Sequence, residues 1–309
     1  MTAAPADILL RIAEVRRRRL AAAAAAGATQ RTPACSIPER EILTAAENRF
    51  LAALSGRPAG PARPRPAPAS PLATAPRPAS ARPPSPAEPA RPKIIAEIKM
   101  GSPRLGDLHG RVDPLAQARI YAAHGAAALS VVVEPDFFHG GYELLAACRA
   151  ASGLPALAKD FVVDPIQLLW ARDAGADAVL LIAALYEGDE LERYARQARG
   201  LGLVPLIEAH DAADLAKLAA ADWELVGVNN RDLRSFEVDL ERSIALLPSL
   251  PPGALKVAES GIRDGLDVAL LGDSGFDAVL IGESLLLAAD PAAKLRELAG
   301  AGRLARAAE

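Results

Sequence analysis

The chain has 309 residues, of which 51% are hydrophobic, enough to give one large domain or two ordinary ones a full core. Its net charge is −3, but residues 1–92 carry +8 and residues 93–309 carry −11. This acidic main region argues against nucleic acid as a partner, because binding to a phosphate backbone needs clustered lysine and arginine.

Cysteine content and hydropathy restrict the cellular setting. The two cysteines, Cys35 and Cys148, lie far apart and have no histidines at ligand spacing, so we expect neither a disulfide framework nor a metal site. No apolar run reaches membrane-spanning length, and the run Arg16–Arg19 interrupts the place where a secretory signal needs its apolar centre. We therefore expect a cytoplasmic protein with no membrane partner.

Residues 1–56 are predicted to form an N-terminal helical extension. An apolar stripe predicts a helix over Ile8–Ala25, with Asp7 as its cap and Gly27 at its end. We interpret the four arginines inside this helix, 16 to 19, as a solvated face rather than an anion site. A second helix is predicted over Glu39–Leu54, where the apolar residues share one face.

Residues 57–92 hold 13 of the 26 prolines, separated mainly by alanine, serine and arginine, with no aromatic residue. Such a segment cannot bury enough apolar surface to offset its ordering entropy, so we expect a disordered linker. PxxP spacings such as Pro58–Pro61 leave open a weak partner with an aromatic groove, although a plain spacer is favoured.

From residue 93 onward the pattern changes, and residues 93–309 are predicted to form the catalytic domain. Eight short apolar runs predict strands: Ile94–Ile98, Ala128–Val133, Ala156–Ala158, Ala178–Ile182, Val204–Ile207, Leu225–Val228, Leu255–Ala258 and Ala278–Ile281. Amphipathic stretches predict helices between them over Pro114–His124, Pro165–Ala174, Glu187–Gly200 and Asp211–Ala220, with Gly125, Gly175 and Gly202 as helix ends.

This alternation predicts an α/β fold, the (β/α)8 TIM barrel. Eight strand and helix repeats in about 210 residues agree with the usual size of that barrel. The rival fold is a doubly wound open sheet, which usually places a glycine-rich phosphate loop after its first strand. Met100–Pro103 is not such a loop. We therefore favour the barrel.

Polar residues follow nearly every predicted strand, and in a barrel all these strand ends meet at one mouth. Glu97 and Lys99 share one side of the first strand, where a structural salt bridge alone would also explain them. A whole ring of such residues is harder to explain structurally, because desolvating many charges is costly. The other strand ends contribute Ser102, Lys159, Asp160, Glu208, Asn229, Asn230, Arg231, Glu259, Ser260, Gly261, Gly282, Glu283 and Ser284.

The residue types in this ring predict acid–base catalysis on a phosphorylated substrate. We assign no histidine or cysteine to a strand end, which argues against thiol catalysis and against a tightly bound transition metal. Lysines among carboxylates can donate protons, and the carboxylates beside them can be tuned as acid or base. The stretches Ser260–Ile262 and Gly282–Ser284 suit a phosphate held by backbone N–H groups.

These residues also carry a resemblance to a known family. Over residues 93–298, in the same order, the chain resembles indole-3-glycerol phosphate synthase in the segments Ile95–Lys99 with Ser102–Pro103, Ala158–Pro165, Leu206–His210, Gly227–Leu233, Ala258–Ile262 and Ile281–Leu285. The resemblance implies a cofactor-free carbon–carbon lyase of tryptophan biosynthesis. Such an enzyme converts 1-(2-carboxyphenylamino)-1-deoxyribulose 5-phosphate to indole-3-glycerol phosphate, carbon dioxide and water.

The resemblance implies roles residue by residue. Lys159 matches the lysine that acts as an acid on the ribulose carbonyl during ring closure. The residues matching those of dehydration, with acid and base left open among them, are Glu208, Lys99 and Glu97. Positions that hold the substrate are matched by Ser102, Asn229 and Glu259, assisted by Arg231 and Ser260, with Phe138 and Phe161 against the anthranilate ring. The phosphate cradle is matched by Gly261, Gly282 and Glu283.

Two departures from the family pattern leave alternatives open. Arg104-Leu105-Gly106 stands where the family usually has Ser-Lys-Gly, and Val131–Pro135 ends the second strand where a Leu-Thr pair is common. A paralogue acting on a related phosphorylated sugar, such as an isomerase or epimerase, therefore stays open. A second alternative is a binding protein tethered through the proline-rich segment, with the barrel in a secondary role.

Overall fold

The computed structural model describes residues 8–26, 37–56, 91–219, 221–231 and 237–300. Asp7, Gly27 and Cys35 lie outside these ranges, as does nearly all of the predicted linker, so the predictions made for them concern residues that are not described here. Cys148 is buried.

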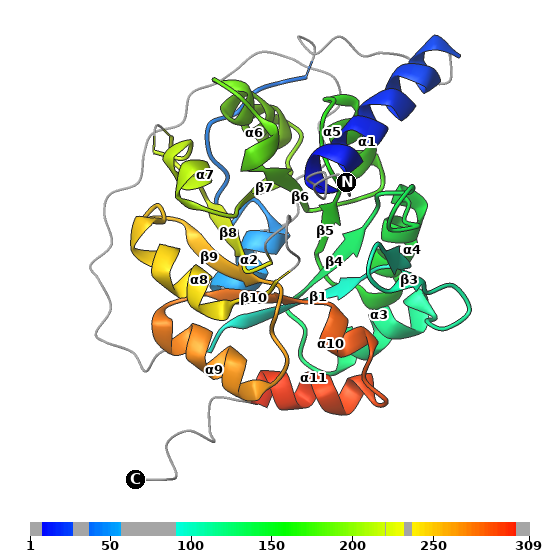
Figure 1. Ribbon diagram of the computed structural model, residues 1–309, viewed down its shortest axis with the longest axis vertical. Coiled ribbons are helices and arrows are strands. Elements are labelled where there is room, and N and C mark those ends of the chain that lie inside the picture. The colour runs from blue at the N-terminus through cyan, green and yellow to red at the C-terminus, as the bar shows by residue number, and fades with distance from the viewer. Residues whose placement is uncertain (1–7, 27–36, 57–90, 220, 232–236, 301–309) are drawn as a thin grey trace, which may run out of the picture.

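Eight parallel strands close into a barrel, which confirms the predicted (β/α)8 fold (Figure 1). The strands follow chain order around the barrel, and β1 closes it by pairing with both β4 and β10. They are β1 (Lys93–Ile98), β4 (Ala128–Val132), β5 (Ala156–Lys159), β6 (Ala178–Ile182), β7 (Val204–Ala209), β8 (Leu225–Asn229), β9 (Leu255–Glu259) and β10 (Ala278–Ile281).

The strands form where they were predicted because each apolar run is covered on both of its faces. All five residues of β4, β6 and β8 are buried, and so are all six residues of β7. Parallel strands between a packed barrel interior and an outer layer of helices read as continuous apolar runs. The register places Asn229 beside Glu259 and Ile182 beside Glu208, so the polar residues at the strand ends become neighbours.

Helices surround the barrel, joined by short turns. They are α3 (Pro114–Ala123), α4 (Tyr142–Ser152), α5 (Ile166–Asp173), α6 (Glu190–Gly200), α7 (Ala212–Ala216), α8 (Leu240–Leu246), α9 (Gly265–Ser274), α10 (Glu283–Leu286) and α11 (Pro291–Gly300), with 3-10 turns η2 (Ala183–Leu185) and η3 (Leu247–Ser249). A short hairpin, β2 (Gly101–Ser102) with β3 (Gly106–Asp107), follows β1. The four predicted helices are present, although α7 is shorter than predicted.

The predicted helix ends at glycine are confirmed. Gly125, Gly175 and Gly202 have φ values of 109°, 87° and 79°. This is the left-handed region that terminates helices and that side chains with a Cβ disfavour.

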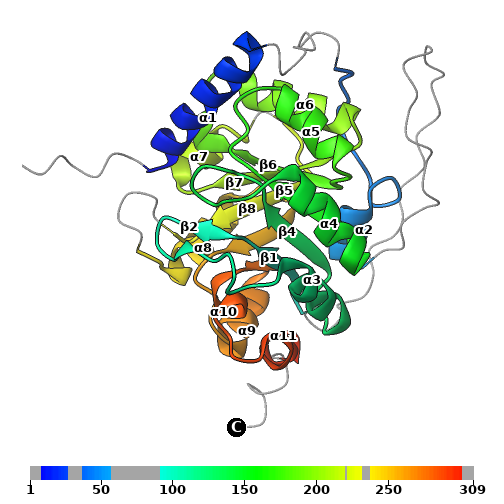
Figure 2. The same ribbon diagram turned by 90° about the vertical axis from the view of Figure 1, so that its right-hand side faces the viewer.

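The helix α1 (Ile8–Ala25) has the predicted bounds, but its arginines are not all solvated. Arg16 is buried and pairs with Asp160 at the end of β5, while Arg19 pairs with Asp136 in the loop after β4. The interpretation of the arginine run as a solvated face is therefore wrong for Arg16. Figure 2 shows α1 on the side of the barrel where β2 lies, which is the carboxyl end of the strands.

The helix predicted over Glu39–Leu54 is wrong in its first ten residues. Only α2 (Arg49–Ser55) is helical, and Asn48 caps it by accepting N–H bonds from the first turn. Upstream, two backbone groups bond to the barrel and its helices: the Arg40 N–H donates to Arg196 O at 3.0 Å and the Leu43 N–H donates to Glu224 Oε1 at 2.7 Å. Periodicity could not reveal these distant partners.

Candidate active site

A pocket of about 820 Å³ opens at the carboxyl ends of the strands. It gathers most of the site residues predicted from the sequence: Glu97, Lys99, Phe138, Lys159, Phe161, Glu208, Asn229, Arg231, Ser260, Gly261, Gly282 and Glu283. Two of the predicted site residues, Glu259 and Ser102, do not line the pocket. Glu259 contacts Lys159, with its Oε2 2.7 Å from Lys159 Nζ. Ser102 lies in β2, where its hydroxyl accepts the Leu105 N–H at 3.0 Å.

The Lys159 ammonium is the centre of the charged cluster. Its Nζ lies 2.7 Å from Glu259 Oε2, 3.6 Å from Glu208 Oε2 and 3.9 Å from Glu97 Oε2. The three carboxylates come from β9, β7 and β1, so the cluster exists only in the closed barrel. Because the lysine side chain is only 18% exposed, these contacts are strengthened by the scarcity of water around them.

Glu97 and Lys99 form the expected salt bridge, with Lys99 Nζ 2.9 Å from Glu97 Oε1. The other oxygen of Glu97 faces Lys159, so this carboxylate lies between the two ammonium groups of the pocket. Burial would raise the pKa of Glu97, but Lys99 and Lys159 outweigh it and lower that pKa. Glu97 is therefore an ionised group that links the two lysines.

The other members of the cluster are held in defined charge states. Burial alone would lower the pKa of Lys159, yet its three carboxylate neighbours raise it above the usual value, so the ammonium persists. For Glu208, burial is outweighed by Lys159 and His210, which lower its pKa. Glu259 is fully buried, and burial together with the charge of Glu208 raises its pKa despite the contact with Lys159. The cluster thus combines a stable acid with carboxylates of different basicity.

The prediction that no histidine lies at a strand end is wrong. His210 directly follows β7, with Nε2 3.2 Å from Glu208 Oε1 and Nδ1 3.4 Å from Asp214 Oδ2. Burial lowers the pKa of His210, but the two carboxylates raise it to about 10. The apolar run seemed to end at Ile207, whereas β7 continues to Ala209. The motif Glu208-Ala209-His210 was the signal that could have revealed this contact.

The loops after β9 and β10 form the opposite end of the pocket. Ser260 and Gly261 both have positive φ values, 66° and 81°. A Cβ on Gly261 would meet Val238 Cγ1 at 2.1 Å, and one on Gly282 would meet Glu97 Oε1 at 2.3 Å. Glycine at these two positions therefore allows Val238 and Glu97 to pack closely against the backbone at this end of the pocket.

Glu283 adds a charge to this end of the pocket. Its carboxylate pairs with Arg104, and its Oε2 lies 3.7 Å from Arg231 Nη2. Arg104, one of the departures from the family pattern, thus lines the pocket. Arg104 and Arg231 thus bring positive charge to this end, and Glu283 partly offsets it.

Two phenylalanines form an apolar wall beside the lysines. The rings of Phe138 and Phe161 stack with centroids 6.0 Å apart and planes at 30°. The backbone around Phe138 is held by Glu134, whose carboxylate accepts N–H bonds from residues 136, 137 and 138 at 2.7 to 3.1 Å. Asn230, also at a strand end, is fully buried and its amide donates to Glu259 O and Ser260 O, so its role is structural.

No group of three or more His, Cys, Asp or Glu in the described ranges is placed to hold a metal ion. No helix in the described part of the chain is long and apolar enough to span a membrane.

Comparisons with known proteins point to one family. The family model for indole-3-glycerol phosphate synthase matches residues 85–298. The chain is 45% identical to the indole-3-glycerol phosphate synthase of Carboxydothermus hydrogenoformans over 206 residues, covering 66% of this chain and 78% of that protein. It is 47% identical to that of Azoarcus sp. over 212 residues, covering 68% and 80%.

A likeness to solved structures supports the fold alone. The 3-hexulose-6-phosphate synthase of Salmonella typhimurium is 18% identical to this chain, with a TM-score of 0.54 over 68% of this chain and 98% of that one. Thiamine phosphate pyrophosphorylase from Pyrococcus furiosus is 14% identical, with a TM-score of 0.51 over 68% and 95%.

Proposed function

The chain belongs to the indole-3-glycerol phosphate synthase family, and from that premise we propose that its pocket closes the indole ring of 1-(2-carboxyphenylamino)-1-deoxyribulose 5-phosphate, with loss of carbon dioxide and water. The observation that carries the assignment of roles is the central position of Lys159 among Glu97, Glu208 and Glu259. An ammonium held charged between carboxylates is an acid that stays protonated at neutral pH.

Ring closure requires an acid at the ribulose carbonyl. The aromatic carbon that bears the carboxylate attacks the carbonyl carbon, and the carbonyl oxygen takes a proton to become a hydroxyl. We assign that proton to Lys159, because its carboxylate neighbours keep it cationic and its side chain lines the pocket. Loss of carbon dioxide then restores the aromatic ring.

Dehydration requires a second acid and a base. The new hydroxyl must leave as water, while the carbon next to the ring nitrogen gives up a proton to form the indole double bond. Lys99 is assigned as the acid because it is the second ammonium lining the pocket beside the cluster, held there by Glu97. Glu208 is assigned as the base because its lowered pKa keeps it ionised.

The remaining groups bind the two ends of the substrate. We assign the phosphate to the end formed by Gly261, Gly282 and Arg231, because these residues line the pocket together and the arginine supplies a positive charge. The anthranilate ring is assigned to the wall formed by Phe138 and Phe161. Asn229 and Ser260 lie along the pocket between the strand ends, where they would meet the hydroxyls of the ribulose chain.

The test is direct turnover by the purified full-length protein. We expect the carboxyphenylamino ribulose phosphate to give the indole absorbance, with one carbon dioxide released for each indole formed. A folded protein that leaves this substrate unchanged would refute the proposal. If the protein instead isomerised a ribulose or hexulose phosphate that lacks the anthranilate ring, we would assign it as a paralogue acting on a related phosphorylated sugar.

The proposal also covers the cellular compartment of the reaction and the role of residues 57–92. We place the reaction in the cytoplasm, as expected from the sequence, and assign residues 57–92 as a spacer. Deleting residues 58–88 should leave turnover unchanged. A loss of turnover, or of a partner recovered with the full-length chain, would assign the proline-rich segment a binding role.

A further inference from the structure

The helix α1 is outside the barrel, yet it sends one charged side chain into the protein. Arg16 Nη2 lies 2.7 Å from Asp160 Oδ2, and the two side chains are only 4% and 0% exposed. A buried ion pair is costly to form, and its geometry must be good for it to persist. Of the two partners, one belongs to the N-terminal helix and the other directly follows the proposed catalytic acid, Lys159.

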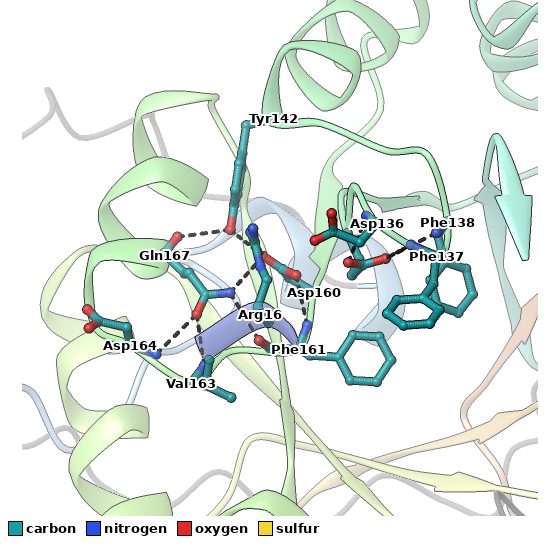
Figure 3. Close-up of polar contacts among 11 residues, drawn as sticks. Arg16, Asp136, Phe137, Phe138, Tyr142, Asp160, Phe161, Val163, Asp164 and Gln167 are labelled. Atoms are coloured by element: carbon teal, nitrogen blue, oxygen red, sulfur yellow. Dashed lines mark hydrogen bonds and ion pairs between the residues drawn. The ribbon is translucent and has the colours of Figure 1, made fainter. Parts of the chain in front are cut away.

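Asp160 lies at the pocket lining, and its carboxylate accepts several hydrogen bonds from the surrounding protein (Figure 3). Its Oδ2 also accepts the Tyr142 hydroxyl and the Gln167 amide, each at 2.8 Å, and its Oδ1 accepts the Phe161 N–H at 2.9 Å. Three neutral donors and one guanidinium thus share one carboxylate. Among the described residues, only the guanidinium supplies the opposite charge within hydrogen-bond distance.

Gln167 extends this network along the loop after β5. Its Oε1 accepts the N–H groups of Val163 and Asp164 at 2.8 and 3.1 Å, and its Nε2 also donates to Phe161 O at 3.0 Å. The backbone from residue 160 to residue 164 is therefore tied to a single buried cluster (Figure 3). Lys159 lies at one edge of this segment, and Phe161 lies within it.

The helix α1 also contacts the loop that carries the other ring of the apolar wall. Arg19 Nη1 lies 2.6 Å from Asp136 Oδ1, and Arg11 lies over the ring of Phe137, with Cζ 5.8 Å from its centroid. These contacts are more exposed than the Arg16 pair. The helix α1 therefore contacts both loops that carry the stacked phenylalanines. Its buried contact is with the loop that follows Lys159.

We propose that Arg16 is a positioning residue of the reaction: from α1 it fixes Asp160, and through Asp160 it sets the backbone that presents Lys159 and Phe161 to the substrate. The inference rests on the proposed function of the pocket. Without the guanidinium, the buried Asp160 carboxylate would be left without its charge partner, so its side chain would turn away and release the Phe161 N–H. The Phe161 ring and the Lys159 ammonium would then no longer be held in place by the same hydrogen-bond network.

The test compares variants of two arginines on the same helix. Arg16→Met keeps the apolar stem and removes the guanidinium, while the matched control Arg18→Met alters a side chain that is 76% exposed and paired within α1 to Glu14. We expect Arg16→Met to lower kcat/KM by about 10- to 100-fold, the scale of a misplacement of about 1 Å in an active site. The control should stay within about twofold, because exposed pairs contribute little.

A conservative variant separates positioning from folding. Arg16→Lys keeps the charge but not the planar fork, so it should recover part of the activity and also serve if Arg16→Met does not fold. All assays are made well below each variant's unfolding temperature. If Arg16→Met is less stable but keeps the kcat and KM of the control, Arg16 is merely structural and the inference is overturned.

A readout that does not depend on turnover distinguishes this inference from the proposed function. Hydrogen–deuterium exchange of a peptide spanning residues 159–168 should be faster in Arg16→Met than in wild type or Arg18→Met, because the amides of Phe161, Val163 and Asp164 lose their fixed acceptors. Unchanged exchange would overturn the inference whatever the activity. A wild-type protein without turnover would instead refute the proposed function, and the exchange measurement would still decide whether Arg16 holds this segment.

Discussion

His210 should make the stability of the barrel depend on pH in a defined direction. Its ring lies between Glu208 and Asp214, at 3.2 and 3.4 Å, and these carboxylates raise its pKa to about 10 from the ordinary 6.5. The folded protein therefore holds this proton more tightly than the unfolded chain does. The stability from the charged ring is fully present below pH 6.5 and is lost as the pH rises through 10.

The size of the effect follows from the same shift. At about 1.36 kcal/mol for each pH unit, a pKa raised from 6.5 to about 10 corresponds to on the order of 5 kcal/mol of unfolding free energy. The ring is only 11% exposed, so solvent screens these contacts little. His210→Gln keeps a polar side chain of similar size but cannot carry the charge.

The assay is urea unfolding of wild type and His210→Gln at pH 6, 8 and 10. We expect the wild type to be more stable at pH 6 and the difference to shrink steadily toward pH 10. His124→Gln is the control, because His124 Nδ1 lies 2.9 Å from the backbone oxygen of Ile120. A difference between wild type and His210→Gln that stays constant or grows with pH would refute the reasoning.

Three further predictions address the ends of the pocket and the N-terminal attachment. Glu283→Gln should lower KM for the phosphorylated substrate by about 2- to 5-fold, because it frees Arg231 and removes a negative charge from the proposed phosphate end; a raised KM in steady-state kinetics would contradict this. Phe161→Ala should raise KM by about 10-fold with a smaller change in kcat, since it removes half of the stacked wall; an unchanged KM would count against that site for the anthranilate ring. Gly200→Ala should lower the free energy of unfolding by about 1 to 3 kcal/mol in urea, because the added Cβ would meet Pro38 O at 1.7 Å. Gly253→Ala is the control, because a Cβ there has open space. Equal urea midpoints for the two variants would show that residues 37–48 move aside without cost.

The strands of the barrel could be predicted from the sequence because their physics is local. Each apolar run, rich in branched residues, is buried on both faces, so neither its position nor its length depends on one distant partner. The segment before α2 shows the opposite case. Its apolar residues have helical spacing, but the N–H groups of Arg40 and Leu43 bond to Arg196 and Glu224, more than 150 residues away in the chain. Nothing in the local pattern indicates those acceptors.

The functional site also contains some residues that could be predicted from local sequence and others that could not. Residues at the strand ends could be grouped in advance because a parallel barrel must bring those ends together, and the pocket contains Lys99, Lys159 and Glu208 as predicted. His210 was missed because the strand before it is two residues longer than its apolar run. Arg16 was missed because a run of four arginines normally faces water, and its partner Asp160 lies 144 residues later.

The central claim is that Lys159 supplies the proton for ring closure. Its most direct test is the single-turnover rate of Lys159→Met on the carboxyphenylamino ribulose phosphate, compared with wild type and with Lys294→Met, which alters a lysine on α11 paired with Glu297. We predict a loss of about 10²- to 10⁴-fold for Lys159→Met, the usual contribution of one general acid, with no change for the control. A folded Lys159→Met protein that closes the ring within tenfold of the wild-type rate would contradict the account.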